Sequence, residues 1–441
     1  MPDGTICAVA TPPGRGGIGV VRLSGPDTAA LTEAVVGPLP APRRASMRRF
    51  AGDDGSAIDA GLVLWFPGPQ SFTGEDVAEL HGHGGPVVMD RLLQRLLGLG
   101  ARLATPGEFS HRAYLNGRID LTRAEAIADL IEAGSESAAR AAVRSLQGEF
   151  AATIDALVQR LTDLRVHLEA GIDFADEPLE GLALEDVTRQ VEGVAAEVAT
   201  TRQAAGRGQQ LQEGLSVVIA GRPNAGKSSL LNALAGRDAA IVTALAGTTR
   251  DVLESYLHID GLPLRVLDTA GLREGGDVVE QEGVRRAHKA MAAADRILRV
   301  VDDSDPGDEA LPPAEWPDHV PVTTVYNKID RSGRAAGESA AGLAVSALTG
   351  DGMDALRGHL RACLGADDTE AVFIARRRHL QALDAAAGQI DEALAAARAG
   401  AGEELIAESL AAAQASLGEI TGAVSTEDLL GRIFSTFCIG K

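Results

Sequence analysis

The sequence predicts a multidomain α/β and α chain, with an N-terminal α+β domain, a long helical bundle, and an α/β domain with a mainly parallel sheet inserted into that bundle. Apolar strands alternate with helices between 214 and 367, which is typical of parallel strands joined by crossover helices. Stretches rich in Ala, Leu, Glu and Arg, with few helix breakers, lie on both sides of that segment. Because each helical flank needs a partner for its apolar stripe, we expect the two to form one bundle. Two unrelated helical segments are the alternative.

The chain has 441 residues, enough for roughly three domains at about 150 residues each. Short β-like runs broken by Gly and Pro begin the chain, and leucines at helical spacing follow from Leu157 and again from Leu380. We expect an N-terminal α+β domain at 1–118, a first helical part at 119–213, the inserted domain at 214–367 and a second helical part at 368–441 with a Cys-Ile-Gly-Lys tail. Strands are expected at 5–10, 19–23, 61–66, 217–220, 265–267, 297–301, 322–326 and 343–345.

The formal net charge is −21, from 41 Lys and Arg against 62 Asp and Glu. Binding to nucleic-acid phosphates depends on cations that release counterions, so this balance argues against a chain that coats nucleic acid by itself. Any RNA contact must use a partner or a local basic cluster, and ordinary solvation of an acidic chain explains such clusters equally well. The candidates are Arg376, Arg377, Arg378 and His379, and Arg43, Arg44, Arg48 and Arg49.

Three cysteines, Cys7, Cys363 and Cys438, form no CxxC pair, which argues against a disulfide framework and a thiolate zinc site and favours a cytoplasmic setting. The first residues lack a basic and then apolar leader, and no stretch of about 18 uncharged apolar residues occurs, so neither secretion nor a membrane span is expected. His81 and His83 lack a third ligand at metal-binding spacing, so we expect a structural or polar role for them.

The segment GRPNAGKS at 221–228 fits the pattern GxxxxGK[ST] between an expected strand and an expected helix. Glycines allow a loop whose backbone N–H groups surround phosphates at a helix N-terminus. In such a loop Lys227 bridges the β- and γ-phosphates and the Ser228 hydroxyl binds magnesium. The alternative is a Gly-rich turn with no phosphate-binding role, but such a turn would not require both a strand before it and a helix after it.

The segment Asn327-Lys328-Ile329-Asp330 follows the expected strand at 322–326. The Asp330 carboxylate can accept from the N1–H and the exocyclic amine of guanine, whereas adenine presents an acceptor at N1. GTP is therefore expected rather than ATP. Residues 346–348 end another strand and can offer a backbone N–H to guanine O6.

Asp268-Thr-Ala-Gly271 follows a strand, where Asp268 can hold the magnesium shell and the Gly271 N–H can meet the γ-phosphate. The next residue, Leu272, cannot orient the attacking water, so another group must do so. Arg250 and Arg273 could supply positive charge, although solvated switch residues explain both.

Three further segments are ATPPGRGGIGVVR at 10–22, SFTGED at 71–76 and FCIGK at 437–441. With the nucleotide motifs, they make the chain resemble the bacterial tRNA modification GTPase MnmE (TrmE) family along essentially its whole length. The resemblance implies a folate-binding and dimerising N-terminal domain, a helical domain made from both flanks, and an inserted Ras-like P-loop GTPase domain. It also implies a homodimeric GTP hydrolase that joins the FAD protein MnmG (GidA) in a heterotetramer-type complex. Together they would add an aminomethyl or carboxymethylaminomethyl group to C5 of the wobble uridine of tRNA.

The resemblance also implies catalytic and metal-binding roles. Glu280 matches the family's water-activating glutamate, although by itself it is one acid among several in a switch segment. Potassium would replace an arginine finger as the charge that bridges the phosphates. The potassium ligands would be Asn224, Thr243, Leu245 and Thr248, and the magnesium ligands Ser228 and Thr249. The GTP contacts would be Asn224, Ala225, Gly226, Lys227, Ser228, Ser229, Thr243, Ala244, Leu245, Ala246, Gly247, Thr248, Thr249, Asp268, Thr269, Ala270, Gly271, Asn327, Lys328, Asp330, Ser346, Ala347 and Leu348.

Family positions matching Arg22, Glu79, Arg118 and Lys441 would bind a 5-formyltetrahydrofolate-like or methylenetetrahydrofolate ligand. Arg and Lys can pair with glutamyl carboxylates, and a Glu can accept from the pterin amine and ring N–H. At position 118 the family also uses Lys, so Arg118 keeps the charge and changes the geometry.

Cys438 lies four residues from the end, in the register of a prenylation motif, but Gly and Lys at the last two positions argue against a lipid anchor. It is either a free thiol on a flexible tail or, as the resemblance implies, a residue beside the tRNA-modifying centre. Two other functions stay open. One is an Era-like ribosome-assembly GTPase, which would need a basic RNA-binding appendage that the sequence lacks. The other is a folate transferase whose GTPase is only regulatory.

Overall fold

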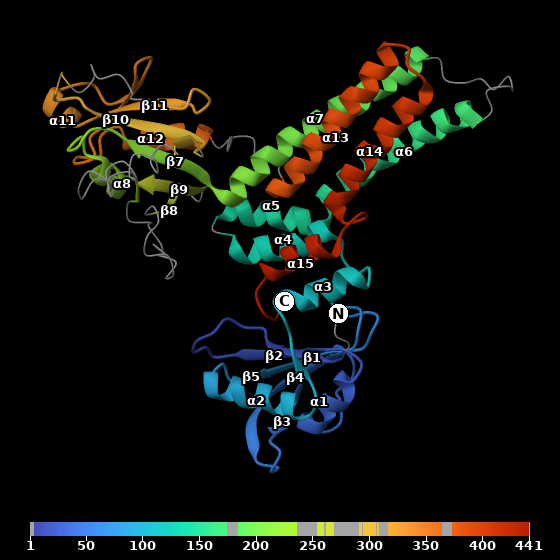
Figure 1. The fold of residues 1–441 in the computed structure, drawn as a ribbon. Helices are drawn as coiled ribbons and strands as arrows, with labels where there is room; N and C mark the ends of the chain where they lie inside the picture. The colour runs from blue at the N-terminus through green and yellow to red at the C-terminus, as the bar shows by residue number, and fades with distance from the viewer. Residues whose placement is uncertain are drawn as a thin grey trace, which may run out of the picture. The chain divides into compact units, whose positions relative to one another are not determined.

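The computed structural model describes residues 4–133, 135–173, 184–235, 254–259, 262–268, 291–292, 294–305, 307, 316–363 and 373–440 (Figure 1). The chain divides into two compact units. The first contains Met1–Ala128, Leu146–Asp163 and Gln414–Lys441, and the second contains Asp129–Ser145 and Leu164–Ala413. Each unit thus combines segments that lie far apart in the sequence.

The first unit contains a six-stranded sheet in the order β3-β4-β5-β2-β1-β6. Every neighbouring pair is antiparallel except β1 and β6, which are parallel. Because side chains alternate along a strand, one face of the sheet buries apolar residues such as Val21, Phe50 and Leu80 together with residues of two helices. The opposite face carries Arg22 and Glu79, which pair across β2 and β5. The strands are β1 Ile6–Val9, β2 Gly19–Ser24, β3 Ser46–Ala51, β4 Ala57–Phe66, β5 Val77–Gly82 and β6 Arg102–Leu103, and the helices are α1 Thr28–Val36 and α2 Pro86–Gly98.

Two short helices of the first unit, α3 Glu108–Leu115 and α15 Glu427–Ser435, pack through aromatic side chains. The His111 ring stacks on Phe434 with centroids 4.5 Å apart, and Phe437 is buried next to Phe434. The Tyr114 hydroxyl donates to the carbonyl of Gly422 over 2.7 Å. The last residues of the chain are thereby held within the N-terminal unit.

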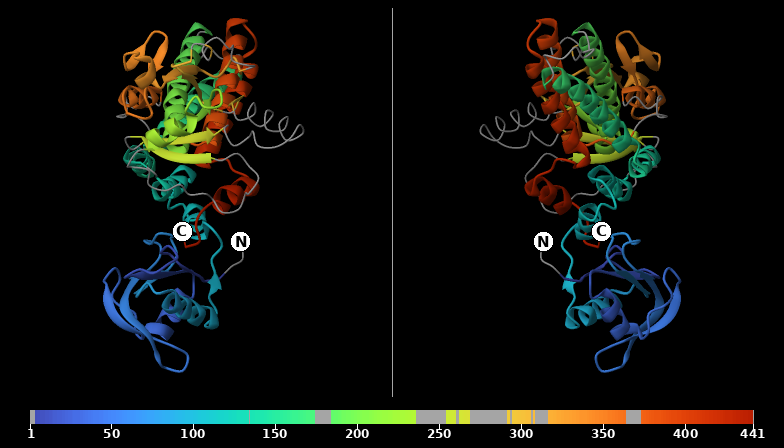
Figure 2. Two further views of the ribbon diagram at one scale, coloured as in Figure 1. Left: turned by 90° about the vertical axis from the view of Figure 1, so that its left-hand side faces the viewer. Right: turned by 90° about the vertical axis from the view of Figure 1, so that its right-hand side faces the viewer.

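Long helices dominate the remaining chain outside the second sheet. Within the second unit, α7 and α13 lie side by side, although they flank the inserted domain from opposite ends (Figures 1 and 2). Ion pairs join Arg202 to Asp384 and Arg398 to Glu192 between them. The expected pairing of the two helical flanks is therefore confirmed. The helices are α4 Leu121–Glu132, α5 Glu136–Gln147, α6 Glu149–Asp173, α7 Leu184–Glu213, α13 Arg377–Arg398 and α14 Glu403–Thr421.

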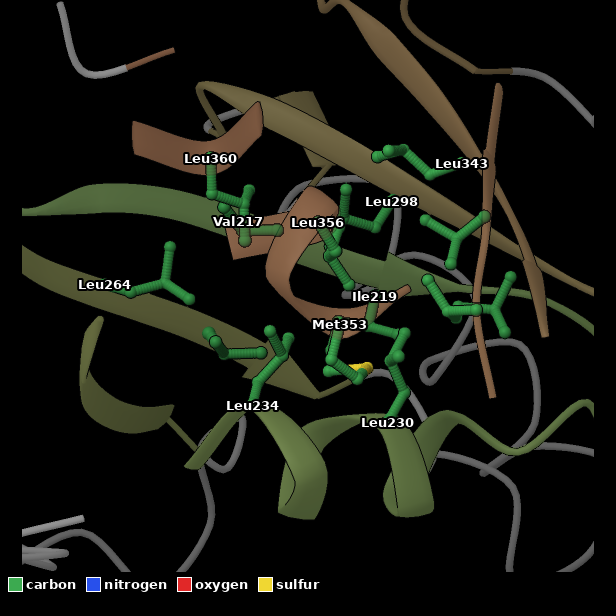
Figure 3. Close-up of a cluster of buried hydrophobic side chains, with 14 of the residues drawn as sticks. Val217, Ile219, Leu230, Leu234, Leu264, Leu298, Leu343, Met353, Leu356 and Leu360 are labelled. Atoms are coloured by element: carbon green, nitrogen blue, oxygen red, sulfur yellow. The ribbon is translucent and has the colours of Figure 1, made fainter. Parts of the chain in front are cut away.

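The inserted domain contains a seven-stranded sheet in the order β12-β13-β11-β10-β7-β9-β8. The five central strands run parallel, and the edge strands β8 and β12 run antiparallel to their neighbours. Leu230 and Leu234 of α8 and Leu356 of α12 belong to one buried apolar cluster with Val217 and Ile219 of β7 (Figure 3). The elements are β7 Leu215–Ala220, α8 Lys227–Ala235, β8 Glu254–Ile259, β9 Leu262–Asp268, β10 Arg296–Asp302, β11 Val322–Asn327, α11 Ile329–Ser332, β12 Gly337–Ser339, β13 Gly342–Ala344 and α12 Met353–Cys363.

The carboxyl ends of the central strands meet at one edge of this sheet. Strand β7 ends at Ala220, β10 at Asp302 and β11 at Asn327, and Asp302 lies in register with Asn327. Open α/β sheets bind ligands outside the carboxyl ends of their strands. The motifs at 221–228 and 327–330 both begin at this edge, which makes it the candidate site.

Among the helices that the structure describes, none combines the length and the apolar character that crossing a membrane requires.

Candidate functional site

The loop between β7 and α8 depends on two glycines with left-handed backbone angles. A Cβ on Gly221, whose φ is +155°, would lie 2.3 Å from the carbonyl oxygen of Val300. A Cβ on Gly226, whose φ is +91°, would lie 2.2 Å from Nδ2 of Asn327. Glycine is therefore required at both positions. Asn224 itself has a φ of +68°, so the loop turns sharply at its middle.

The Lys227 ammonium lies over this loop. Its Nζ donates to the carbonyls of Gly221 at 3.0 Å and Arg222 at 2.9 Å. Lys227 is also the first residue of α8, where the backbone N–H groups and the helix dipole favour an anion. The loop, the lysine and the helix terminus together favour a bound phosphate group.

Two neighbouring side chains hold the phosphate loop in place. They belong to Asn327, the last residue of β11, and to Lys328, the residue that follows it. Asn327, 2% exposed, donates from Nδ2 to the carbonyl of Ala225 over 3.0 Å, and its Oδ1 accepts from the Ala347 N–H over 3.1 Å. The next residue, Lys328, donates from Nζ to the carbonyl of Asn224 over 2.6 Å. The structure thus joins the loops at 221–228, 327–330 and 346–348, which the sequence analysis assigned to one site.

The Asp330 carboxylate is oriented by a hydroxyl from the third loop. Ser346 donates from Oγ to Oδ1 of Asp330 over 2.6 Å. The Ser346 N–H donates to the carbonyl of Asp351 over 2.8 Å, and the Ala347 N–H donates to Asn327. One backbone N–H of residues 346–348 was expected to face guanine O6, and the N–H groups of Ser346 and Ala347 are engaged within the protein. Leu348, the third residue, is 82% exposed.

Several predicted site residues lie outside the part of the chain that the structure describes. They are Glu280, Thr243, Ala244, Leu245, Ala246, Gly247, Thr248, Thr249, Thr269, Ala270, Gly271 and Lys441, together with Arg250 and Arg273. For Asp268 only the backbone is described, in register with Ile219 at the end of β9.

A second cluster lies on the N-terminal sheet, on the face opposite its main core. Arg22 donates to Oε1 of Glu79 from Nε at 3.0 Å and from Nη2 at 2.8 Å, and the Nε2 of His81 lies 3.1 Å from the Glu79 Oε2. Burial alone would raise the pKa of Glu79, but Arg22 and His81 outweigh it and hold that pKa below its ordinary value. The Arg22 guanidinium also lies 5.8 Å from the ring centroids of both Phe72 and Phe109.

The C-terminal tail reaches this second cluster. Arg22 Nη1 donates to the carbonyl of Gly440 over 3.4 Å, and the Gly107 N–H donates to the carbonyl of Cys438 over 3.3 Å. A Cβ on Gly440 would lie 2.6 Å from the carbonyl oxygen of Val9, so the tail approaches β1 closely. Cys438 itself is exposed.

The structure does not bring every predicted residue of this cluster together. Arg118 is exposed and lies against Gly74, where an added Cβ would be 3.3 Å from the Arg118 Cγ. Within the described residues, no hydrogen bond or ion pair joins Arg118 to Arg22 or Glu79. His81 and His83, for which a structural or polar role was expected, pair with different carboxylates, His81 with Glu79 and His83 with Asp59.

A charged network that includes Glu108 and Arg112 of α3 was not predicted from the sequence. Arg112 donates to both carboxylate oxygens of Glu75 at 3.1 and 3.0 Å and to Glu108 at 3.1 Å. Arg102 donates to Glu108 at 2.9 Å. Burial would raise the pKa of Glu108, but hydrogen bonds from Arg102, the Thr105 N–H and Arg112 lower it to about 2. The one sequence feature that pointed toward this network was Glu75, which lies within the 71–76 motif.

The basic cluster at 376–379 includes residues with structural partners. Arg376 forms an ion pair of 2.6 Å with Asp129, whose side chain is almost fully buried. The Arg376 N–H donates to Nδ1 of His379 over 3.0 Å at the start of α13. These two residues therefore fix the helix start. By contrast, Arg43, Arg44 and Arg49 are exposed, and Arg48 is partly exposed.

Comparisons with known proteins cover nearly the whole chain. The family model for the MnmE helical domain matches residues 121–438, and the model for the GTP-binding protein TrmE N-terminus matches residues 5–118. The tRNA modification GTPase MnmE of Alkalilimnicola ehrlichii is 55% identical over 443 residues, covering 99% of each chain. The protein of the same description from Stutzerimonas stutzeri is 56% identical over 455 residues, again covering 99% of each.

Among solved structures, an Era variant of Aquifex aeolicus with bound GDP and aluminium fluoride matches at 28% identity, covering 40% of this chain and 66% of that one, with a TM-score of 0.26. The motifs, the P-loop GTPase fold of the inserted domain and the full-length similarity lead to one conclusion: the chain belongs to the tRNA modification GTPase MnmE family.

Proposed function

We propose that GTP binds at the carboxyl edge of the seven-stranded sheet and that its hydrolysis there drives C5 modification of the wobble uridine in tRNA. The observation that carries this proposal is the contact between the two loops, in which Asn327 and Lys328 hold the carbonyls of Ala225 and Asn224. With the guanine base of GTP held at 327–330, the phosphates of the same nucleotide would lie at 221–228.

Base selection would depend on Asp330. Ser346 already donates to Oδ1, so the plane of the carboxylate is set before any ligand arrives. A carboxylate in that position accepts from the N1–H and exocyclic amine of guanine, whereas the N1 lone pair of adenine would face it unfavourably.

The metal ligands proposed here are Ser228 and Thr249 for Mg²⁺, and Asn224, Thr243, Leu245 and Thr248 for K⁺. Two of them are described, and both are exposed at the loop. Ser228 is the second residue of α8, so its hydroxyl lies beside the loop that would hold the phosphates. Oxygen donors of this kind suit hard cations. The magnesium ion would neutralise phosphate charge, while Glu280 would orient the attacking water in place of the glutamine absent at Leu272.

For the N-terminal unit we propose a folate-borne one-carbon ligand bound by Arg22, Glu79, Arg118 and Lys441. The donor set of the two paired residues fits such a ligand. The low pKa of Glu79 keeps it a carboxylate, and its Oε2 retains lone-pair capacity beyond the contact with His81, so it can accept from a pterin amine, whereas Oε1 already accepts twice from Arg22. Phe72, which is partly exposed beside the Arg22 guanidinium, would offer apolar surface to a flat ring.

The tail gives Cys438 a defined position in this proposal. Its carbonyl is held by Gly107, and Gly440, two residues later, touches Arg22. The exposed thiol would therefore lie near the one-carbon ligand and face tRNA. Two copies of the chain with two copies of the FAD protein MnmG would form the modifying complex, and potassium-dependent pairing of the GTPase domains would move it through its cycle.

Mass spectrometry of tRNA nucleosides from cells that lack this chain tests the proposal. We expect loss of the C5 modification at the wobble uridine, with recovery when the wild-type chain is restored. A Cys438→Ser chain should hydrolyse GTP normally and fail to restore the modification, whereas Cys363→Ser serves as the matched control and should restore it. An unchanged nucleoside profile with accumulated ribosome precursors would instead indicate the Era-like assembly function.

A further inference from the structure

Asp302, the last residue of β10, is the acidic side chain that lies against the lysine of the base-recognition loop. Its Oδ2 lies 2.5 Å from the Nζ of Lys328, and both side chains are largely shielded from solvent. The same ammonium donates to the carbonyl of Asn224 over 2.6 Å. One lysine thus joins the end of a central strand to the middle of the phosphate loop.

The position of the carboxylate is fixed from its other side. Asp302 Oδ1 accepts from the N–H of Ser304 at 3.1 Å and from its hydroxyl at 2.6 Å. These bonds form a local turn in which Asp302 cannot rotate without losing both. Burial would raise the pKa of Asp302, but Lys328 and Ser304 lower it overall, so the group stays ionised at neutral pH.

Lys328 and Asn224, which are joined by a hydrogen bond, both have unusual backbone φ angles. Lys328 has a φ of +66° and Asn224 a φ of +68°. A residue other than glycine rarely adopts such angles, because its Cβ approaches the backbone, and surrounding contacts must maintain them. The chain of contacts from Ser304 through Asp302 and Lys328 to Asn224 supplies such a restraint for both residues.

We infer that Asp302 is a positioning residue of the nucleotide site, which aims the Lys328 ammonium at the Asn224 carbonyl and so sets the phosphate loop relative to the base-recognition loop. This inference deepens the proposed function, on whose nucleotide site it rests. It adds a residue outside all the nucleotide motifs of the sequence. Asp302 itself would not touch the nucleotide.

The test is a double-mutant cycle in the full-length chain, with affinity for a fluorescent GDP analogue as the readout. Asp302→Asn keeps the size of the side chain and the Oδ1 acceptor for Ser304 but removes the charge that holds Lys328. We expect GDP affinity to fall about fivefold to tenfold, in the range for loss of one partner of a partly buried ion pair. The KM for GTP should rise by a similar factor while kcat at saturating GTP stays within about twofold, as for loss of binding common to the ground and transition states.

The second arm of the cycle uses Lys328→Met. If Asp302 acts through Lys328, the double variant should bind GDP no more weakly than Lys328→Met alone. Additive losses in the double variant, or GDP affinity within twofold of wild type for Asp302→Asn, would overturn the inference.

Asp303→Asn is the matched control. The Asp303 side chain is nearly buried in the same turn, and it pairs with Arg334 at 2.6 Å and accepts from the Ser332 hydroxyl, without touching either lysine or loop. The Asp303→Asn substitution should lower the unfolding temperature as much as Asp302→Asn does, while GDP affinity stays within twofold of wild type. Equal losses of GDP affinity in both variants would show a merely structural role and overturn the inference.

An Asp330→Asn variant separates this inference from the proposed site. If Asp330→Asn does not change the preference of the chain from guanine to xanthine nucleotides, the proposed base site is wrong. If it succeeds and the cycle shows no coupling, only the role of Asp302 falls.

Discussion

The side-chain amide of Asn327 joins two loops of the nucleotide site, since its Nδ2 donates to the Ala225 carbonyl and its Oδ1 accepts from the Ala347 N–H. The residue is 2% exposed, so the Ala225 carbonyl would lose a buried hydrogen bond and the Ala347 N–H a partly buried one if the amide were removed. Residue 226 must be glycine, because the Asn327 amide occupies the space that a Cβ would fill.

Asn327→Ala should therefore both destabilise the inserted domain and weaken nucleotide binding. An unsatisfied buried group costs about 1–3 kcal/mol, so we expect GDP affinity to fall at least tenfold, measured by titration with a fluorescent analogue. Asn232→Ala, at an exposed position of α8, is the control and should bind GDP as wild type does. Wild-type affinity in Asn327→Ala would contradict the role of this amide.

Replacing potassium by sodium should slow GTP turnover by about an order of magnitude or more if Asn224 is a potassium ligand. The smaller ion would not reach the loop oxygens and phosphates together, so less charge would be neutralised in the transition state. Turnover is measured as phosphate release in matched chloride salts. An Asn224→Ala chain should lose the difference between the salts, and equal rates for wild type in both salts would exclude a potassium ligand at this position.

Glu280→Ala should leave GDP affinity unchanged and reduce GTP hydrolysis at least a hundredfold, within the range for loss of a group that assists proton transfer or water orientation. Single-turnover hydrolysis and nucleotide titration separate the two effects. Glu282→Ala, two residues away, should retain turnover. If Glu280→Ala also retains turnover, another group must orient the water.

Glu108→Gln tests the buried charge network of the N-terminal unit. The folded pKa of Glu108, about 2, lies below the ordinary value of 4.5. The charged group therefore stabilises the fold fully above about pH 4.5, and this contribution is lost as the pH falls toward 2. The shift corresponds to about 3 kcal/mol at neutral pH.

In urea unfolding of the full chain at pH 7, Glu108→Gln should destabilise the N-terminal unit by an amount of that order, and the difference from wild type should shrink in acid. Glu136→Gln is the control, because within the described residues Glu136 forms only an exposed pair with Arg140 on one helix. Equal stability of Glu108→Gln and wild type at pH 7 would contradict a strongly lowered pKa.

The parts of the fold that the sequence predicted well depend on local patterns. The expected strands at 217–220 and 297–301 correspond to β7 Leu215–Ala220 and β10 Arg296–Asp302, because buried parallel strands appear as short apolar runs. The sequence also predicted that the helical flanks on either side of the inserted domain share one bundle, as the packing of α7 against α13 shows. The edge strands β8 and β12 were missed, since they are short or more polar and form only against a neighbour already in place.

The nucleotide loops were predictable because a fixed spacing brings their functional groups to one turn. The contacts of Asp302 with Lys328 and of Glu75 with Arg112 were not, because these partners lie 26 and 37 residues apart in the sequence and only the folded chain brings them together. The same reason explains Arg376, for which the sequence left RNA contact and ordinary solvation open, and which pairs with Asp129.

The central claim is that guanine is read by Asp330 at the edge where the strands end. The most direct measurement compares hydrolysis of GTP and XTP by wild type and Asp330→Asn. Xanthine carries a carbonyl where guanine carries the amine, so an asparagine amide can donate to it. Our account predicts that Asp330→Asn prefers XTP by at least tenfold while wild type prefers GTP. An Asp330→Asn chain that still prefers GTP would contradict it.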